Sequence, residues 1–294
     1  MRRRDKAELR EEKAGGMNYA LCNELFGGME AGGAARLAGE AGYGGMEFAP
    51  YTVFGSFSPA EVRAGLGNIK RALGDNGLAF AGFHWLLVDS RPLSLVSPDR
   101  ALRQPALDRL RLLLSAAAEL GGASLVLGSP KQRGSVPGQS AGEAKKILGE
   151  SLASLGDFAV SCNSKILLEA LDHSQCDVVN TLAESLEMVK AIGSPGISGM
   201  FDFHNTGDEK ESWESLIRRY RDLVAHVHIN EMNGDVPGSG TSDYVPAFRA
   251  LGETAFEGWI SVEIFSQPEN PARAIGGALA FMRETEARAR TYGA

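Results

Sequence analysis

The stretch Lys165-Ile-Leu-Leu-Glu169 is a short apolar run that ends in a carboxylate. Three later runs also end in an acidic or imidazole side chain: Ser198-Gly-Met-Phe-Asp202, Ala225-His-Val-His228 and Trp259-Ile-Ser-Val-Glu263. The four polar residues are 33, 26 and 35 positions apart, which is too far for one helix or loop. This spacing is typical of a repeated strand–helix unit that brings each strand end to one common rim.

The same rhythm extends over most of the 294 residues. Apolar runs bounded by Gly or polar residues predict eight strands, at Met17–Cys22, Gly44–Phe48, Leu78–His84, Ala123–Gly128, Lys165–Glu169, Ile197–Phe203, Val224–Asn230 and Gly258–Phe265. Segments with helical periodicity separate them, among them 102–120, 144–160, 179–192 and 271–289. A period of roughly 35 residues predicts the α/β class and a (β/α)8 TIM barrel. A doubly wound sheet is disfavoured because its usual G-x-G-x-x-G loop is missing after the first strand.

The domain organisation predicted from the sequence is simple. No linker rich in Pro, Ser or charge divides the chain, so residues 17–294 are expected to form a single barrel domain. Residues 1–16 are charged and end in Gly15-Gly16, so we expect a flexible extension outside the fold. Met17 is then an alternative start of the chain.

Composition and charge limit the partners of this protein. A net charge of -7 and a pI near 5.4 give no general attraction to nucleic acid or to an anionic membrane. No segment approaches the roughly 18 apolar residues of a membrane span, and the basic start has no apolar stretch of a secretory signal behind it. The three cysteines form no CxxC pattern, which indicates free thiols and a cytoplasmic location.

Convergence of four strand ends would place Glu169, Asp202, His228 and Glu263 in one site. Each follows a run of residues that we expect to be buried, where an unpaired charge is expensive and one shared cation would compensate all four. Three carboxylates and an imidazole form a mainly hard donor set, which suits Mn²⁺, Mg²⁺ or Co²⁺ and is also compatible with Zn²⁺. The alternative is a purely structural polar network.

Several motifs resemble one known superfamily. They are Leu168-Glu-Ala-Leu171, Phe201-Asp-Phe-His204, His226-Val-His-Ile-Asn-Glu231, Pro237-Gly-Ser-Gly240 and Val262-Glu-Ile-Phe265. They are similar to the xylose-isomerase-like barrels, and most of all to the sugar phosphate isomerase/epimerase branch with the D-tagatose and D-psicose 3-epimerases. The resemblance implies that the four residues bind one divalent metal ion and that Glu169 and Glu263 are the acid/base pair. Proton transfer through a metal-stabilised enediolate would then give epimerisation or aldose–ketose isomerisation.

Six further residues are predicted to contact a small sugar or keto-polyol substrate: Glu47, His84, Gln175, His204, Asn205 and Glu231. Two of them close the second and third strands, and Glu231 matches the acidic residue that follows the ligand His in the family. Three positions depart from the epimerase pattern. Asn205 stands where the epimerases have His, Gln175 where they often have Glu, and Gly234 where they have Arg.

The motifs leave other functions open. An inosose-type dehydratase would use the same proton abstraction but expel a hydroxyl group. A metal-dependent AP endonuclease would need more His ligands than the five histidines of this chain readily supply, and a non-catalytic sugar-binding barrel would not need all four site residues. Barrels of this kind often form homo-oligomers, and Phe54, Phe57 and Trp85 in long loops are candidates for a lid or an interface.

Overall fold

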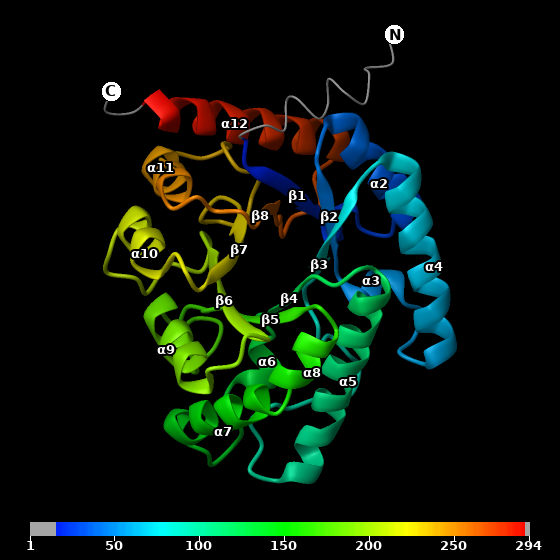
Figure 1. The fold of residues 1–294 in the computed structure, drawn as a ribbon, viewed down its shortest axis with the longest axis vertical. Coiled ribbons are helices and arrows are strands. Elements are labelled where there is room, and N and C mark those ends of the chain that lie inside the picture. The colour runs from blue at the N-terminus through cyan, green and yellow to red at the C-terminus, as the bar shows by residue number, and fades with distance from the viewer. Residues whose placement is uncertain (1–15, 292–294) are drawn as a thin grey trace.

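The computed structural model describes residues 16–291, and its strands form a closed barrel in sequence order from β1 to β8 (Figure 1). The strands are β1 (Asn18–Cys22), β2 (Gly45–Phe48), β3 (Ala79–Phe83), β4 (Ser124–Leu127), β5 (Lys165–Leu168), β6 (Ile197–Asp202), β7 (Val224–Ile229) and β8 (Trp259–Val262). All neighbouring strands pair in parallel. The (β/α)8 prediction is confirmed, and each predicted apolar run contains its strand.

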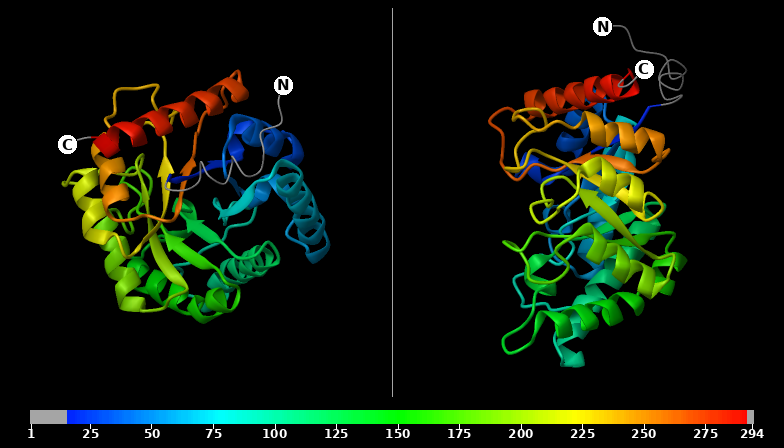
Figure 2. Two further views of the ribbon diagram at one scale, coloured as in Figure 1. Left: turned by 45° about the horizontal axis from the view of Figure 1, so that its top comes forward. Right: turned by 90° about the vertical axis from the view of Figure 1, so that its left-hand side faces the viewer.

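Helices surround the strands (Figure 1). They are η1 (Glu24–Phe26), α2 (Ala31–Ala41), α3 (Pro50–Val53), α4 (Pro59–Asn76), α5 (Arg100–Glu119), α6 (Pro130–Arg133), α7 (Ala141–Ala153), α8 (Gly156–Ser161), α9 (Leu182–Ile192), α10 (Trp213–Tyr220), α11 (Val245–Glu253) and α12 (Pro271–Thr291). The last of these, α12, packs beside α11 and α2 (Figure 2). No helix in the described range is long and apolar enough to cross a membrane. Residues 1–15 of the predicted N-terminal extension lie outside the described residues.

The strands form because their side chains are buried on both faces of the sheet. In β5, Ile166, Leu167 and Leu168 are all buried, and Leu168 pairs with Leu127 of β4. Parallel strands covered by helices outside and by side chains inside read as continuous apolar runs, because neither face meets water. The next residue of the chain is Glu169, so the point where the apolar run stops is also the rim of the barrel.

Local signals at the helix ends fix where each helix begins and stops. Ser140 accepts a hydrogen bond from the Glu143 N–H, and the Glu143 side chain accepts from the Ser140 N–H, which makes a capping box at the start of α7. One helix prediction was too long: the segment 144–160 is divided between α7 and α8. A Cβ on Gly156 would clash with Ser194, so this glycine lets the start of α8 pack closely on the loop before β6.

The long loop after β3 is anchored to the helix that follows it. Asp89 accepts hydrogen bonds from the Arg91 side chain and from Arg109 of α5, whose guanidinium is buried and lies 3.1 Å from the centre of the Phe57 ring. A buried, paired guanidinium is expensive to separate from its partner. These contacts therefore hold the loop that carries His84 and Trp85 at the mouth of the barrel.

Candidate active site

The four residues predicted to share a metal ion come together at the carboxyl ends of four strands. Glu169 directly follows β5, Asp202 ends β6, His228 lies near the end of β7, and Glu263 directly follows β8. All four are buried, and one ligand atom from each lies within 4.8 Å of the others. His228 Nδ1 is 3.0 Å from Glu263 Oε2.

The electrostatics of this group match a cation site. Burial raises the pKa of Asp202 well above its usual value, and the Glu169 and Glu263 carboxylates raise it further. Burial and then Glu263 raise the pKa of Glu169 in the same way. Burial acts to raise the pKa of Glu263, but His228, whose Nδ1 lies 3.0 Å from Glu263 Oε2, outweighs it and lowers that pKa. Three crowded carboxylates around one imidazole fit a divalent cation, which would relieve the repulsion between the carboxylates and use His228 Nδ1 as a ligand.

The other nitrogen of His228 points to Glu47. Both Glu47 oxygens lie 3.3 Å from His228 Nε2, and Glu47 Oε2 is 2.8 Å from His226 Nε2. Burial acts to raise the Glu47 pKa, but His226 and His228 outweigh it and hold that pKa well below normal. A carboxylate behind a metal-binding histidine fixes the ring, so Glu47 leaves Nδ1 directed at the carboxylates. Both histidines point the same way, as the alternation of a strand predicts.

Asn205 links two of the carboxylates. Its Nδ2 donates to Glu169 Oε1 at 3.0 Å and to Asp202 Oδ2 at 2.7 Å. Gln175 Nε2 in turn donates to Asn205 Oδ1 at 2.6 Å, and the His204 backbone N–H donates to Asp202 Oδ1. This chain of amides sets the orientation of both carboxylates before any ligand arrives.

A cavity of about 210 Å³ opens beside the four-residue group. It is lined by His84, Trp85, Val126, Gly128, Ser129, Pro130, Glu169, Leu171, Gln175, His204, Asn205, Glu263 and Phe265. Four of the six predicted substrate contacts are therefore in its wall. Glu47 and Glu231 lie outside this lining; Glu231 Oε1 accepts a hydrogen bond from the Gly238 N–H and fixes that loop. Their contact with substrate stays a prediction.

The sequence pattern of the family described as "Xylose isomerase-like TIM barrel" matches residues 35–285. The chain belongs to that family.

Several proteins that are similar to this chain are sugar epimerases. A 3-dehydro-D-guloside 4-epimerase of Escherichia coli is 28% identical over 190 residues, which is 62% of this chain and 71% of that protein. A D-psicose 3-epimerase of Agrobacterium fabrum is 28% identical over 206 residues, which is 69% of this chain and 70% of that protein. The apo crystal structure of a 3-keto-D-glucoside 4-epimerase from E. coli has the same fold, with a TM-score of 0.79 at 23% sequence identity. The superposition covers 92% of this chain and 100% of the epimerase chain.

Two residues in the wall of this xylose isomerase-like barrel were not assigned to the site from sequence. The Trp85 indole N–H donates to Glu263 Oε1 at 3.1 Å, which places this lid or interface candidate beside the site. Gly128 leaves the room that Glu169 occupies, because a Cβ there would overlap Glu169 Oε2. Gly128 directly follows β4, and Trp85 follows His84 just after β3, so the strand-end pattern extends to both positions.

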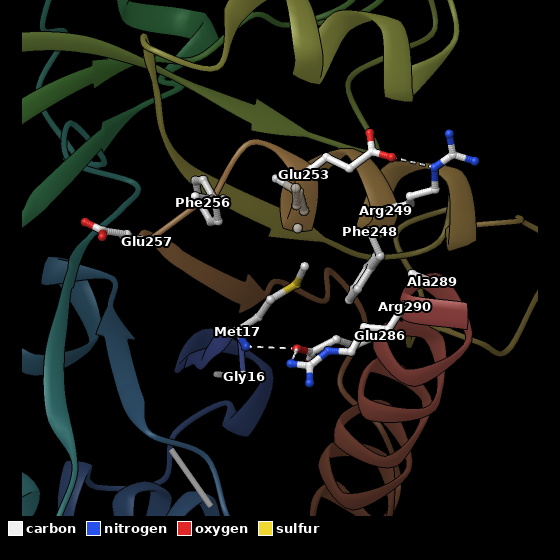
Figure 3. Close-up of a pocket in the computed structure, with 13 residues that line it drawn as sticks. Gly16, Met17, Phe248, Arg249, Glu253, Phe256, Glu257, Glu286, Ala289 and Arg290 are labelled. Carbon is white, nitrogen blue, oxygen red and sulfur yellow. Dashed lines mark hydrogen bonds and ion pairs between the residues drawn. The ribbon is translucent and has the colours of Figure 1, made fainter. Parts of the chain in front are cut away.

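A larger cavity, of about 740 Å³, lies at the opposite end of the same barrel (Figure 3). Its lining includes Met17 just before β1 and Glu257 just before β8. None of the predicted site residues is in its lining. Glu286 accepts hydrogen bonds from the Met17 N–H and from Arg290, so its carboxylate is used in joining the start of the barrel to α12. The chemistry-bearing residues belong to the smaller cavity, not the larger one.

Proposed function

We propose that this protein is a metal-dependent epimerase or isomerase of a small, unphosphorylated keto sugar. The observation that carries the proposal is the group Glu169, Asp202, His228 and Glu263, whose ligand atoms lie within 4.8 Å of one another. Two of its carboxylates, Glu169 and Glu263, also line the cavity. The names of the similar proteins, which are sugar epimerases, support the same conclusion.

The four residues would hold one divalent ion, Mn²⁺, Mg²⁺ or Co²⁺, because three of the four donors are carboxylates. When bound, such an ion supplies Lewis-acid polarisation of the substrate oxygens and so makes the neighbouring C–H more acidic. Glu47 orients the histidine from behind, and Asn205 orients two carboxylates from the side. The chain thus provides both the donors and the groups that fix them.

Proton transfer would be the work of the two glutamates. Glu169 follows β5 and Glu263 follows β8, which are not neighbours in the barrel, so their carboxylates approach the cavity from different strands. One carboxylate removes the proton next to the substrate carbonyl, and the other returns a proton on the opposite face. The enediolate between these steps gives epimerisation, or isomerisation when the proton returns to the neighbouring carbon. Trp85 holds Glu263 by one hydrogen bond.

The cavity wall indicates an uncharged substrate. No Lys or Arg is among the described residues that line it, while Glu169 and Glu263 are. Phosphate groups are normally bound by Arg, Lys or a set of backbone N–H groups, and a phosphate beside two carboxylates would be repelled. A volume of about 210 Å³ is below the roughly 300–1,000 Å³ of drug-sized pockets. One small sugar fits these limits, with Gln175, His204 and Asn205 available for its hydroxyl groups.

A proton-exchange screen tests the function. The manganese-loaded protein is incubated in deuterated water with a panel of ketoses, aldoses, keto-glycosides and keto-inositols, each sugar with its phosphorylated counterpart. We expect carbon-bound deuterium in at least one unphosphorylated compound, and the product then distinguishes epimerisation, isomerisation and dehydration. Absence of deuterium incorporation in every compound would overturn the proposed reaction. Incorporation only into phosphorylated sugars would overturn the proposal that the substrate is unphosphorylated.

Metal analysis tests the ligands independently of any substrate. Asp202→Asn and His228→Ala should each lower the bound manganese, because each removes one donor of the group. His173→Ala is a suitable control, since His173 is exposed and pairs with Asp208 in a loop. Full manganese content in both variants would refute the assignment of Asp202 and His228 as metal ligands.

A further inference from the structure

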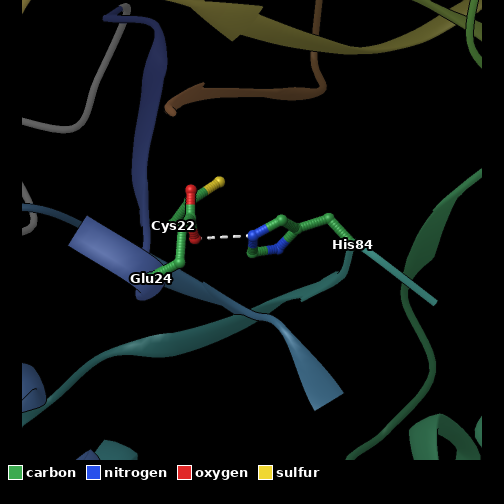
Figure 4. Close-up of side chains that lie close together, drawn as sticks. All are labelled: Cys22, Glu24 and His84. Carbon is green, nitrogen blue, oxygen red and sulfur yellow. Dashed lines mark hydrogen bonds and ion pairs between the residues drawn. The ribbon is translucent and has the colours of Figure 1, made fainter. Parts of the chain in front are cut away.

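A second group of metal-type donors lies beside the proposed metal centre. A ligand atom from each of Cys22, Glu24 and His84 lies within 4.8 Å of the others, and Figure 4 shows the Glu24 carboxylate directed at the His84 ring. Cys22 ends β1, Glu24 begins η1, and His84 follows β3. Both strands pair with β2, so the barrel itself brings the three side chains together.

The burial of this group leaves one carboxylate oxygen without a hydrogen-bond partner in the described part of the chain. Cys22 is fully buried, the His84 side chain is 1% exposed, and the Glu24 side chain is 11% exposed. Glu24 Oε2 and His84 Nε2 lie 2.6 Å apart, whereas Glu24 Oε1 is buried and makes no hydrogen bond within the described residues, and His84 Nδ1 faces Glu47 Oε1 at 3.6 Å. A buried polar atom that lacks a partner costs roughly 1–3 kcal/mol, so the unpaired Glu24 Oε1 beside a thiol and an imidazole points to a ligand.

We propose that Cys22, Glu24 and His84 bind a second divalent cation of the zinc type. A thiolate, an imidazole and a carboxylate are donors that Zn²⁺ and Co²⁺ accept, whereas Mg²⁺ avoids sulfur. The proposed catalytic group contains no sulfur, so the two sites differ in the metal that they prefer. Donors bound at roughly 2.0–2.3 Å lie about 3.2–3.8 Å apart in a tetrahedron, so Glu24 would swing back from His84 by about 1 Å.

Cys22 also lies within 4.8 Å of Glu47 and His228, but that alternative set is already engaged. Glu47 is sealed from solvent and is 2.8 Å from His226, while His228 directs its Nδ1 at Glu263. The partly exposed Glu24 gives the chosen set a route for the ion to enter. Cys22 Sγ is 4.0 Å from His228 Nε2, so the second site adjoins the first.

Cobalt titration of the metal-free protein tests this site without any substrate. A Co²⁺ ion bound by a thiolate shows sulfur-to-metal charge-transfer absorption in the near ultraviolet, and one bound only by oxygen and nitrogen does not. We expect about two cobalt ions per chain, with the thiolate band belonging to one of them. Filling the first group with Mg²⁺ beforehand should leave the band unchanged. Binding of a single ion without the band would overturn the proposal.

Variants assign the band to its residue. Cys22→Ser should abolish the band and leave about one cobalt ion per chain. Glu24→Gln keeps the thiol and, because Glu24 is partly exposed, should fold normally while weakening the second ion at least about tenfold. Cys162→Ser is the matched control, since Cys162 is also a buried free cysteine. A thiolate band that persists in Cys22→Ser refutes the second metal site. A normal thiolate band in a protein that binds no sulfur-free cobalt ion refutes the proposed function instead.

Discussion

A single methyl group added at Gly128 should disable the site without weakening the fold. Gly128 follows β4, and its described neighbours leave no room for a Cβ, because one would overlap Glu169 Oε2. Carbon and oxygen normally touch at about 3.5 Å, so the carboxylate would have to retreat by about 1 Å. The Glu169 side chain can make this movement at little cost. Its catalytic position cannot be kept.

The magnitude follows from that displacement. Misplacing a reacting group by about 1 Å costs on the order of 100-fold in rate, which is about 2.7 kcal/mol in the activation barrier. Gly128 does not have a positive φ, so alanine is compatible with its backbone. Gly→Ala at a compatible position stabilises by about 0.4–1 kcal/mol through the unfolded state. Gly128→Ala should therefore lose about 100-fold in deuterium exchange, bind manganese more weakly, and melt no lower than the parent protein.

The assay is the rate of deuterium incorporation into the active sugar, followed by NMR, together with calorimetric titration of manganese and thermal unfolding. Gly67→Ala is the control, because Gly67 lies inside α4 and a Cβ there meets nothing within 4 Å. That variant should gain about 1 kcal/mol from helix propensity and keep full activity. An exchange rate within about threefold of the parent in Gly128→Ala would refute the reasoning, and so would a loss of rate that comes with a lower melting temperature.

Three further outcomes are expected. Asn205→Ala should weaken manganese binding by about 10–100-fold, because it removes the N–H donors to two carboxylates; an unchanged dissociation constant would contradict this. A chelator should lower the melting temperature and manganese should restore it, because an ion present at 100 times its dissociation constant adds about 2.7 kcal/mol to the free energy of unfolding. Equal melting curves with and without manganese would argue against a bound ion. Asp89→Asn should destabilise the fold by about 2 kcal/mol at neutral pH in urea unfolding, since it weakens the bond to the buried Arg109. Hydrogen bonds from Arg91, and then from Arg109, hold the Asp89 pKa below its usual value. The ionised Asp89 contributes fully to the free energy of unfolding above its unfolded-state pKa of about 3.9. This contribution is lost as the pH falls toward the lower pKa of the folded state, so the free energies of unfolding of the parent and the variant should converge in acid.

The glutamates at the strand ends show which features of the site can be predicted from the sequence. Glu169 and Glu263 were found because an apolar run ends at each of them, and a parallel barrel turns every such end toward one rim. Glu47 also ends an apolar run and is predicted to contact the substrate; it lies beside His228 Nε2 and outside the lining of the cavity, so the sequence did not show its place relative to the histidine. A period of two along a strand says which residues share a face, but the depth of each one within the barrel depends on strand tilt and stagger.

What the sequence by itself determined is the repeating unit: apolar runs, periodic helices and the polar residue at each strand end. These are local properties, because burial on both faces of a strand and the spacing of a helix are written in adjacent residues. Tertiary structure alone decided which side chains touch. Asn205 reaches Glu169 of the neighbouring strand, Trp85 reaches Glu263, and Cys22 and Glu24 meet His84. Such contacts join residues up to 178 positions apart, and only closure of the barrel fixes the distances between them.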